Sequence, residues 1–133
     1  MKKRFYLFGI AVLVTAIVFL MAGCDLFGDD YDMLNGEWDR GDIIITFNDN
    51  NGVFTQINSN SGWHTLLNNG TVRIGDRKFR NLKSSGNLKW TGQELTYLGS
   101  NTSWENTTLT ISGQTLRVET VNVSNPISTY TRR

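Results

Sequence analysis

Two residues in this chain have side chains whose chemistry could define a reactive site. The 133 residues include one cysteine, Cys24, and one histidine, His64. A single cysteine excludes an internal disulfide bond and a cysteine-rich metal site. His64 could serve as a general base only beside a nucleophile and an orienting group, and no Gly-x-Ser-x-Gly motif prepares a serine for that role. We therefore predict that the chain is not an enzyme, that it has no metal site and no cofactor, and that His64 lies at the surface of a polar loop.

The residues before Cys24 indicate a different role for this thiol. Residues 2–4 are Lys-Lys-Arg, residues 5–22 form an almost unbroken apolar run, and Ala22 and Gly23 lie directly before Cys24. Positive charge, an apolar segment and small residues in this order are typical of a secretory signal. The segment resembles a bacterial lipoprotein signal peptide, whose lipobox ends in a cysteine. This resemblance implies cleavage before Cys24 and transfer of a diacylglyceryl group to its thiol.

The alternative for this segment is an uncleaved transmembrane anchor, because about 18 apolar residues nearly span a bilayer. The lipoprotein resemblance instead implies a signal peptide over residues 1–23 and membrane attachment through acyl chains, such as palmitate, on Cys24. Two acyl chains hold a protein stably at a membrane where one chain is marginal. The predicted location is the bacterial cell envelope. Asp25 resembles an inner-membrane retention signal of enteric bacteria, and the choice between inner and outer membrane stays open.

Charge separates this leader from the remainder of the chain. The whole chain has 13 basic and 12 acidic residues and a formal net charge of +1. Residues 2–4 supply three of the basic residues, so residues 24–133 hold 10 basic and 12 acidic residues and carry about −2. This weak charge removes the electrostatic basis for binding nucleic acid. We assign residues 24–35, with four aspartates, to an acidic tether and not to a cation site, since calcium loops space their oxygen ligands regularly.

The residues after the tether have the composition of an all-β domain. No alanine follows Ala22, and residues 24–133 contain 14 asparagines and 14 threonines, which are poor helix formers. Short β-branched and aromatic runs alternate with Gly, Asn and Ser clusters, the pattern of many short strands. Turn signals about every 8–12 residues predict a sandwich or a closed barrel, and short hairpins favour the barrel. We predict one small antiparallel up-and-down barrel of about eight strands over residues 36–133.

Alternation within the runs predicts which side chains face the core. In the run 42–47, the side chains that share one face are Ile43, Ile45 and Phe47. In the run that follows, Val53 and Ile57 share one face and Phe54 lies on the other.

Turn residues predict where the hairpins lie. Residues 48–52 read Asn-Asp-Asn-Asn-Gly, whose members tolerate left-handed backbone. Gly92-Gln93 and Gly113-Gln114 both begin a Gly-Gln-x-Leu sequence, and glycine at the first position of a two-residue loop suits a type II′ turn. Residues 71–74 are predicted to be a strand, and residues 59–70 fit either a strand or a single helical turn.

The first predicted strand begins with Gly36-Glu37-Trp38, which resembles the Gly-x-Trp signature of lipocalins and related calycin barrels. In those barrels the tryptophan packs across the closed end, near an arginine of the last strand. Arg132 is the candidate here, and a cation over an indole face is favourable by about 0.5–1 kcal/mol. The domain is shorter than a typical lipocalin and lacks the family's Thr-Asp-Tyr motif and disulfide. Small lipocalin-like lipoproteins of bacteria are the nearer match.

Large aromatic side chains are the candidate binding residues. Such rings either fill the interior of a small barrel or line a cavity in it. The candidates for ligand contact are Trp38, Trp63, Trp90, Trp104 and Tyr97. The resemblance implies an envelope protein that binds a small apolar ligand, or an extended one such as an envelope polymer. The alternative is a structural or protein-interaction lipoprotein whose filled barrel has no internal ligand site.

Overall fold

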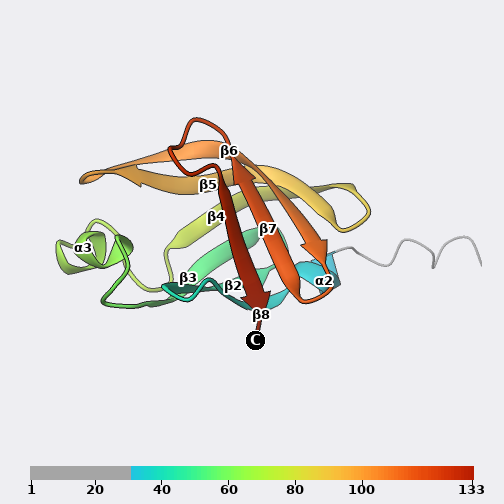
Figure 1. The fold of residues 1–133 in the computed structure, drawn as a ribbon, viewed down its shortest axis with the longest axis horizontal. Coiled ribbons are helices and arrows are strands. Elements are labelled where there is room, and N and C mark those ends of the chain that lie inside the picture. Colours follow the sequence, from blue (N-terminus) through green and yellow to red (C-terminus); the bar gives the residue numbers. More distant parts are fainter. Residues whose placement is uncertain (1–30) are drawn as a thin grey trace, which may run out of the picture.

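Residues 31–133 are described by a computed structural model, in which they form a closed antiparallel barrel of eight strands (Figure 1). Each strand pairs with its neighbour in the sequence, and β8 closes the barrel on β1. The strands are β1 (Gly36–Asp39), β2 (Ile43–Asn48), β3 (Asn51–Ile57), β4 (Arg77–Gly86), β5 (Lys89–Leu98), β6 (Asn101–Ser112), β7 (Thr115–Thr120) and β8 (Ile127–Arg132). Two short helices, α2 (Tyr31–Leu34) and α3 (Trp63–Asn68), accompany them. The predicted all-β up-and-down barrel is confirmed.

Two of the tight turns form where the sequence predicts them. The β2–β3 turn lies at residues 49–50, and Asp49 has a φ of +52°, in the left-handed region that Asp and Asn tolerate. The β6–β7 turn consists of Gly113 and Gln114. Gly113 has a φ of +59°, whereas Gln114 has no positive φ. A positive φ at the first position alone is what a type II′ turn requires.

The turn predicted at Gly92-Gln93 is wrong, because both residues lie inside β5. The chain turns earlier, between β4 and β5, where Leu88 has a φ of +53°. Gly92 instead allows β5 to approach β4 closely: a Cβ added there would lie 2.8 Å from the carbonyl oxygen of Arg80 and 2.8 Å from Leu82 Cδ2. The β4–β5 pairing shifts register just after Arg80, and this irregularity brings the β4 backbone against Gly92.

We expect Gly92→Ala to lower the free energy of unfolding by about 2 kcal/mol, in the range of overpacked cores. The added methyl group would collide with backbone oxygen, which cannot move aside as a flexible side chain would. Urea denaturation of the two proteins measures the difference. Gly99→Ala is the comparison at a glycine with open space around it, although its φ of +62° adds some backbone strain. A loss for Gly92→Ala no larger than that for Gly99→Ala would contradict the close approach.

The predicted core faces of the first hairpin are partly right. Ile43, Ile45 and Phe47 are buried as expected. Phe54 and Ile57 are also both buried, although the alternation places them on opposite faces. The register between β2 and β3 explains this difference. Ile45 pairs with Phe54 and Ile44 pairs with Gln56, so Thr55 has no pairing partner on β2 and is an extra residue in β3. Such a bulge reverses the alternation beyond it, and Phe54 and Ile57 therefore point the same way.

The segment between β3 and β4 is helical where the sequence left two alternatives. Residues 63–68 form α3, whose buried side chains are Trp63 and Leu66. Residues 71–74 do not form the predicted strand. Val72 is nevertheless buried, and its amide donates to the carbonyl oxygen of Leu66, so this loop packs beneath the helix.

The ordered domain begins before residue 36. Tyr31–Leu34, which the sequence predicts to be part of the tether 24–35, form α2 and pack on the barrel. Leu34 is fully buried, and the Tyr31 hydroxyl donates to the carbonyl oxygen of Leu82 at 3.0 Å. The predicted signal peptide, Cys24 and the first residues of the tether lie outside the described residues.

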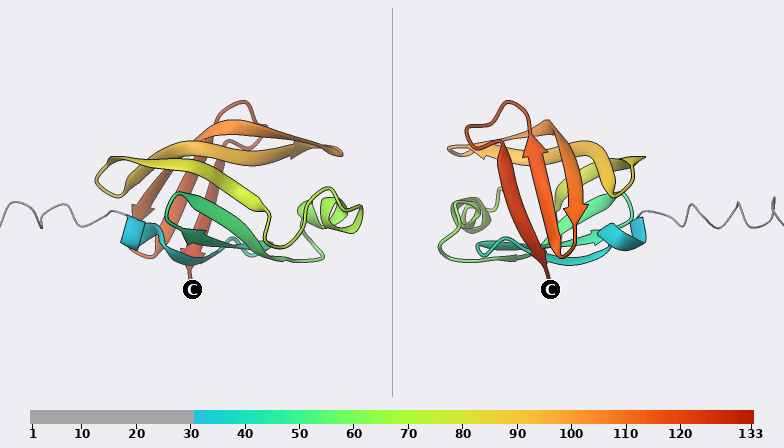
Figure 2. Two further views of the ribbon diagram at one scale, coloured as in Figure 1. Left: turned by 180° about the vertical axis from the view of Figure 1, so that it is seen from behind. Right: turned by 45° about the vertical axis from the view of Figure 1, so that its right-hand side comes forward.

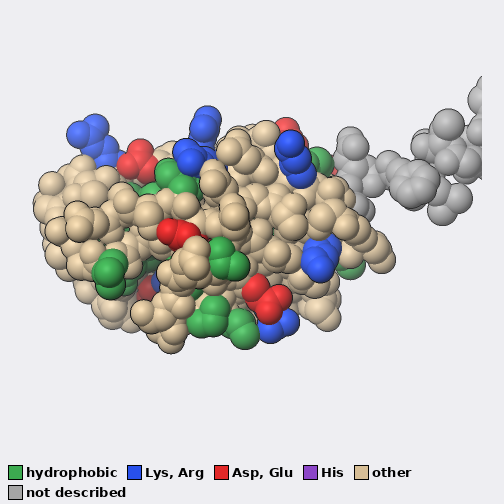
Figure 3. All heavy atoms as spheres, turned by 90° about the horizontal axis from the view of Figure 1, so that it is seen from above, with side chains coloured by type: hydrophobic (Ala, Val, Ile, Leu, Met, Phe, Trp, Pro, Cys, Tyr) green, Lys and Arg blue, Asp and Glu red, His purple; other side chains and the backbone are tan. Residues whose placement is uncertain are grey.

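The two helices lie at opposite ends of the barrel, as the views from the front and from behind both show (Figures 1 and 2). The β5–β6 hairpin is longer than the other strand pairs and extends beyond the barrel toward α3 (Figure 2). Within residues 31–133, no helix is long and apolar enough to span a bilayer. On the face in Figure 3, basic and acidic side chains are interspersed, and exposed hydrophobic side chains form small separate groups.

Candidate functional site

One end of the barrel is sealed by α2 and by the residues of the Gly-x-Trp sequence. Trp38 is fully buried, and its indole Nε1 donates to the carbonyl oxygen of Leu34 at 2.7 Å. Arg132 lies over the same indole, with Cζ 4.6 Å from the ring centroid. Its guanidinium also donates to the carbonyl oxygens of Met33 and Asn35. The structure thus brings Trp38 and Arg132 together at a closed end, the arrangement that the sequence resemblance implies.

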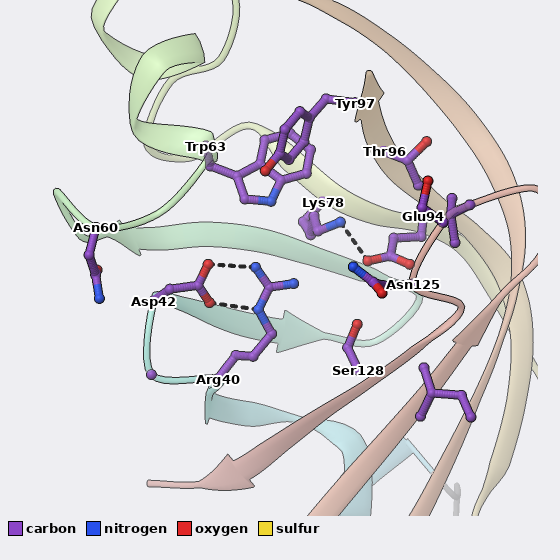
Figure 4. Close-up of a pocket in the computed structure, with 14 residues that line it drawn as sticks. Arg40, Asp42, Asn60, Trp63, Lys78, Glu94, Thr96, Tyr97, Asn125 and Ser128 are labelled. Atoms are coloured by element: carbon purple, nitrogen blue, oxygen red, sulfur yellow. Dashed lines mark hydrogen bonds and ion pairs between the residues drawn. The ribbon is translucent and has the colours of Figure 1, made fainter. Parts of the chain in front are cut away.

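The other end of the barrel holds an open pocket of about 880 Å³. Arg40, directly after β1, and Ile127, the first residue of β8, line the pocket, whereas β1 begins and β8 ends at the sealed end. The side chains that form its inner wall are Arg40, Asp42, Trp63, Lys78, Glu94 and Tyr97 (Figure 4). The volume lies within the range of about 300–1,000 Å³ that is usual for ligand pockets.

A buried ion pair forms part of the pocket floor. Lys78 Nζ lies 2.5 Å from Glu94 Oε1, and the two side chains are 2% and 6% exposed. Lys78 also donates to the carbonyl oxygen of Leu95 and lies 4.6 Å from the centroid of the Trp63 ring. The second carboxylate oxygen of Glu94 accepts a hydrogen bond from Thr120. Burial lowers the pKa of Lys78 from its usual 10.5 to about 8, although the charge of Glu94 opposes this shift.

This lowered pKa predicts that the protein becomes more stable between pH 8 and pH 10. In this interval Lys78 remains protonated in the unfolded chain but loses its proton in the folded one. The unfolded state then binds more protons, so the free energy of unfolding rises with pH, by about 2 kcal/mol over this window. Below pH 8 both states are protonated and the contribution is constant.

Urea denaturation at half-unit pH steps measures this rise, and the double variant Lys78→Met/Glu94→Leu provides the control that should lack it. The series ends at pH 10 because burial raises the pKa of Tyr130. Above pH 10 the unfolded chain therefore loses the Tyr130 proton first, and stability falls. A flat or falling curve between pH 8 and pH 10 would contradict the shift at Lys78.

A second ion pair lies beside the first, at the turn between β1 and β2. Arg40 binds Asp42 through two hydrogen bonds, Nε to Oδ1 at 2.6 Å and Nη2 to Oδ2 at 2.7 Å. Ser61 donates to Asp42 Oδ2 at 2.8 Å and ties this turn to the loop before α3. Burial alone would raise the pKa of Asp42, but the hydrogen bond and charge of Arg40 outweigh it, and the net shift is downward. The carboxylate therefore stays ionised and holds the guanidinium plane in a fixed orientation.

An aromatic pair forms the wall on the α3 side. The rings of Trp63 and Tyr97 meet edge to face, with centroids 4.5 Å apart and planes at 71°. Trp63 is buried against Phe54, whereas Tyr97 is 40% exposed and presents its ring at the pocket rim. A side chain at Gly62 would overlap the Tyr97 hydroxyl, so glycine at this position lets the long β5–β6 hairpin pack on α3.

The five aromatic residues predicted to contact ligand do not form one site. Trp63 and Tyr97 line the pocket. Trp38 lies at the sealed end, and Trp90 is fully buried in the core. Trp104 is half-buried next to Arg80, whose Cζ lies 4.0 Å from its ring centroid.

The four charged residues of the pocket were not predicted from the sequence. Arg40 and Asp42 are two residues apart in a turn, a spacing at which opposite charges can pair, and this signal could have identified them. Lys78 and Glu94 are 16 residues apart on β4 and β5. Lys78 is the extra residue of a bulge in the β3–β4 pairing, and no sequence pattern reveals this bulge.

His64 lies in the first turn of α3, not in a loop. It is half-buried, and its Nδ1 lies 3.2 Å from Nδ2 of the Asn68 side chain. Across residues 31–133, no three His, Cys, Asp or Glu side chains gather in a way that could hold a metal ion. Comparison of the chain with protein-family models, with curated proteins and with solved structures finds no match in any of the three. What the chain does must therefore be inferred from the barrel and its pocket.

Proposed function

We propose that this chain is a non-enzymatic lipoprotein of the bacterial cell envelope that binds a small ligand in the open end of its barrel. The observation that supports this function most directly is the pocket of about 880 Å³ at one end of a barrel whose other end is sealed. Trp90, Phe47 and Phe79 fill the interior between the two ends. A ligand therefore enters the open end and does not pass through the barrel.

The proposed anchor has a consequence for the orientation of the pocket. Cys24 precedes Tyr31 by seven residues, and seven residues span at most about 25 Å. Tyr31 begins α2, which packs at the sealed end of the barrel. Acyl chains on Cys24 would thus hold the sealed end near the membrane, and the open pocket would face away from it.

Native mass spectrometry of the protein purified from its own host tests ligand binding. We expect a bound small molecule whose mass disappears when Ser128, which lines the pocket, is replaced with tryptophan to fill the space. Urea denaturation verifies that the Ser128→Trp variant is folded. A ligand that remains bound to this variant would favour the alternative, in which the outer surface of the barrel binds a partner. Absence of any bound mass on the wild-type protein would oppose the proposal.

The lipid anchor is tested separately by Cys24→Ser. Serine has no thiol that could form a thioether with the diacylglyceryl group, so we expect the variant to remain an uncleaved precursor without acyl chains. Metabolic labelling with a palmitate analogue and the mass of the mature protein measure this loss. Labelling or cleavage that persists in Cys24→Ser would contradict the lipoprotein assignment, and Ser128→Trp should be labelled like the wild type.

A further inference from the structure

The charges in the pocket cancel one another. Arg40 and Lys78 supply two positive groups, and Asp42 and Glu94 supply two negative groups, each bound to its partner within 2.6 Å. An anionic ligand would approach the carboxylates of Asp42 and Glu94, and a cationic ligand would approach Arg40 and Lys78. Because opposite charges are already paired, the pocket offers no unpaired charge to compensate for the lost hydration of an ionic ligand. This balance favours a ligand without net charge.

Apart from Val123 and Ile127, the remaining wall is polar, so it suits a polar ligand better than the apolar ligand that the sequence suggested. The neutral hydrogen-bonding side chains that line the pocket are Asn60, Thr96, Ser124, Asn125 and Ser128. The side chains of Asn60, Ser124, Asn125 and Ser128 would each lose hydration to an apolar ligand without gaining a partner, at a cost of about 1–3 kcal/mol per group. Thr96 already donates to the carbonyl oxygen of Ser103. A ligand with several hydroxyl or amide groups would replace those waters with hydrogen bonds.

Several of these polar groups converge on one space. Asp42 occupies Nε and Nη2 of Arg40, so Nη1 is free of this carboxylate. Figure 4 shows that this nitrogen, the Ser128 hydroxyl and the Asn125 amide all point to the space between Arg40 and Glu94. The donors and acceptors belong to β8, the β7–β8 loop and the β1–β2 turn, so a ligand there would contact three separate segments of the barrel end.

Tyr97 adds an aromatic surface at the rim of the same pocket, on the α3 side beside Trp63. Its ring is 40% exposed and is held by Trp63 and by the close approach to Gly62. An aromatic ring with polar neighbours can stack on a ligand that has an apolar face and a polar edge.

We infer that the ligand is an uncharged sugar, bound with its hydroxyl groups at Arg40, Asn125 and Ser128 and with one face of its ring on Tyr97. This inference rests on the proposed function, namely that the pocket binds a small ligand. Hydroxyl groups both donate and accept, so they match a wall that contains guanidinium, amide, hydroxyl and carboxylate groups. The orientation of the pocket away from the membrane also suits a water-soluble ligand better than a lipid.

Isothermal titration calorimetry of the full-length mature protein in phospholipid nanodiscs tests the sugar class. The probes are N-acetylglucosamine with its dimer and tetramer, and glucose with maltose and maltotetraose. Glucuronic acid is the anionic match to glucose, and indole is the apolar probe. Empty nanodiscs provide the blank. We expect at least one neutral sugar to bind about tenfold more tightly than both glucuronic acid and indole.

Three variants locate the binding site. Tyr97→Ala and Asn125→Ala should each weaken sugar binding about five- to tenfold. Leu98→Ala is the matched control, because Leu98 is adjacent to Tyr97, is 83% exposed and does not line the pocket. Its affinity should equal that of the wild type. Urea denaturation verifies that all three variants are folded.

The outcomes separate this inference from the proposed function. Tighter binding of a tetramer than of its monomer assigns the site to a saccharide chain, and equal binding assigns it to a free sugar; both support the inference. A ligand that co-purifies with the protein and is lost in Ser128→Trp shows that the pocket binds ligand. If in that case no sugar binds, or if glucuronic acid or indole binds more tightly than every neutral sugar, the sugar class is wrong and the proposed function stands. If nothing co-purifies and no probe binds, both are wrong.

Discussion

Replacing Lys78 with methionine is expected to lower the free energy of unfolding by about 3–5 kcal/mol at pH 7, because the change leaves Glu94 buried without its partner. Methionine fills a similar volume but donates no hydrogen bond to Glu94 or to the carbonyl oxygen of Leu95. A lysine that has only lost its proton differs from methionine, because its neutral amine can still donate to Glu94 and to the carbonyl oxygen of Leu95. Urea denaturation measures the loss, with the slope of the unfolding curve as a check that the folded state is unchanged.

The matched control is the double variant Lys78→Met/Glu94→Leu, which removes both charges. Apolar replacement of a whole buried ion pair is often neutral or stabilising. The double variant should therefore recover most of the stability that Lys78→Met loses, even though Thr120 also loses its acceptor on Glu94. Equal instability of the single and double variants would indicate that Lys78 acts through packing against Trp63 and not through its charge.

If the ion pair contributes little to stability, its place in the pocket has a different explanation. Glu94 and Lys78 line the space into which Arg40 and Asn125 point. Two paired charges give the pocket floor donors and acceptors without a net charge. We therefore expect Lys78→Met/Glu94→Leu to fold but to bind sugar at least tenfold more weakly than the wild type, which separates binding from stability.

The architecture could be predicted because it depends on local signals. Inward side chains at Ile43, Ile45 and Phe47, followed by the turn at Asp49, define a hairpin within one stretch of chain. Repetition of such hairpins produces a meander, and closure follows from the pairing of β1 with β8. The same local signals in the sequence do not reveal β-bulges. The extra residue Thr55 reverses the alternation of β3.

The site was predicted less completely than the fold, for a physical reason. Trp63 and Tyr97 could be proposed because large rings are unusual in a small domain. Burial of Lys78 depends on a partner from another strand, and a charged residue near the start of a strand is ordinarily expected at the surface. The misplaced turn at Gly92 has the same origin, since glycine serves here for close contact between strands and not for a turn.

At the opposite end of the barrel, Trp38→Ala is expected to lower the free energy of unfolding by about 3–5 kcal/mol, the usual cost of deleting a buried tryptophan. Trp38 is fully buried, donates to the carbonyl oxygen of Leu34 and lies beneath the guanidinium of Arg132. Urea denaturation measures the loss, and hydrogen exchange of the backbone amides shows where the structure opens. The backbone amide of Asn35 donates to the carbonyl oxygen of Tyr31 at the end of α2. It should lose its protection from exchange before the backbone amides of β5 and β6 do.

Trp38→Phe separates the contribution of the buried ring from that of the indole hydrogen bond. Phenylalanine keeps a buried ring under Arg132 but leaves the carbonyl oxygen of Leu34 without its donor, and we expect a loss of about 1–2 kcal/mol. Because Trp38 lies at the sealed end, neither variant should change sugar affinity where it remains folded. A Trp38→Ala protein as stable as the wild type would contradict the role of this residue as the seal. Sugar binding that fell with Trp38→Phe would instead show that the two ends of the barrel are coupled, because a change at the seal would then reach Tyr97 and Asn125 through the strands between them.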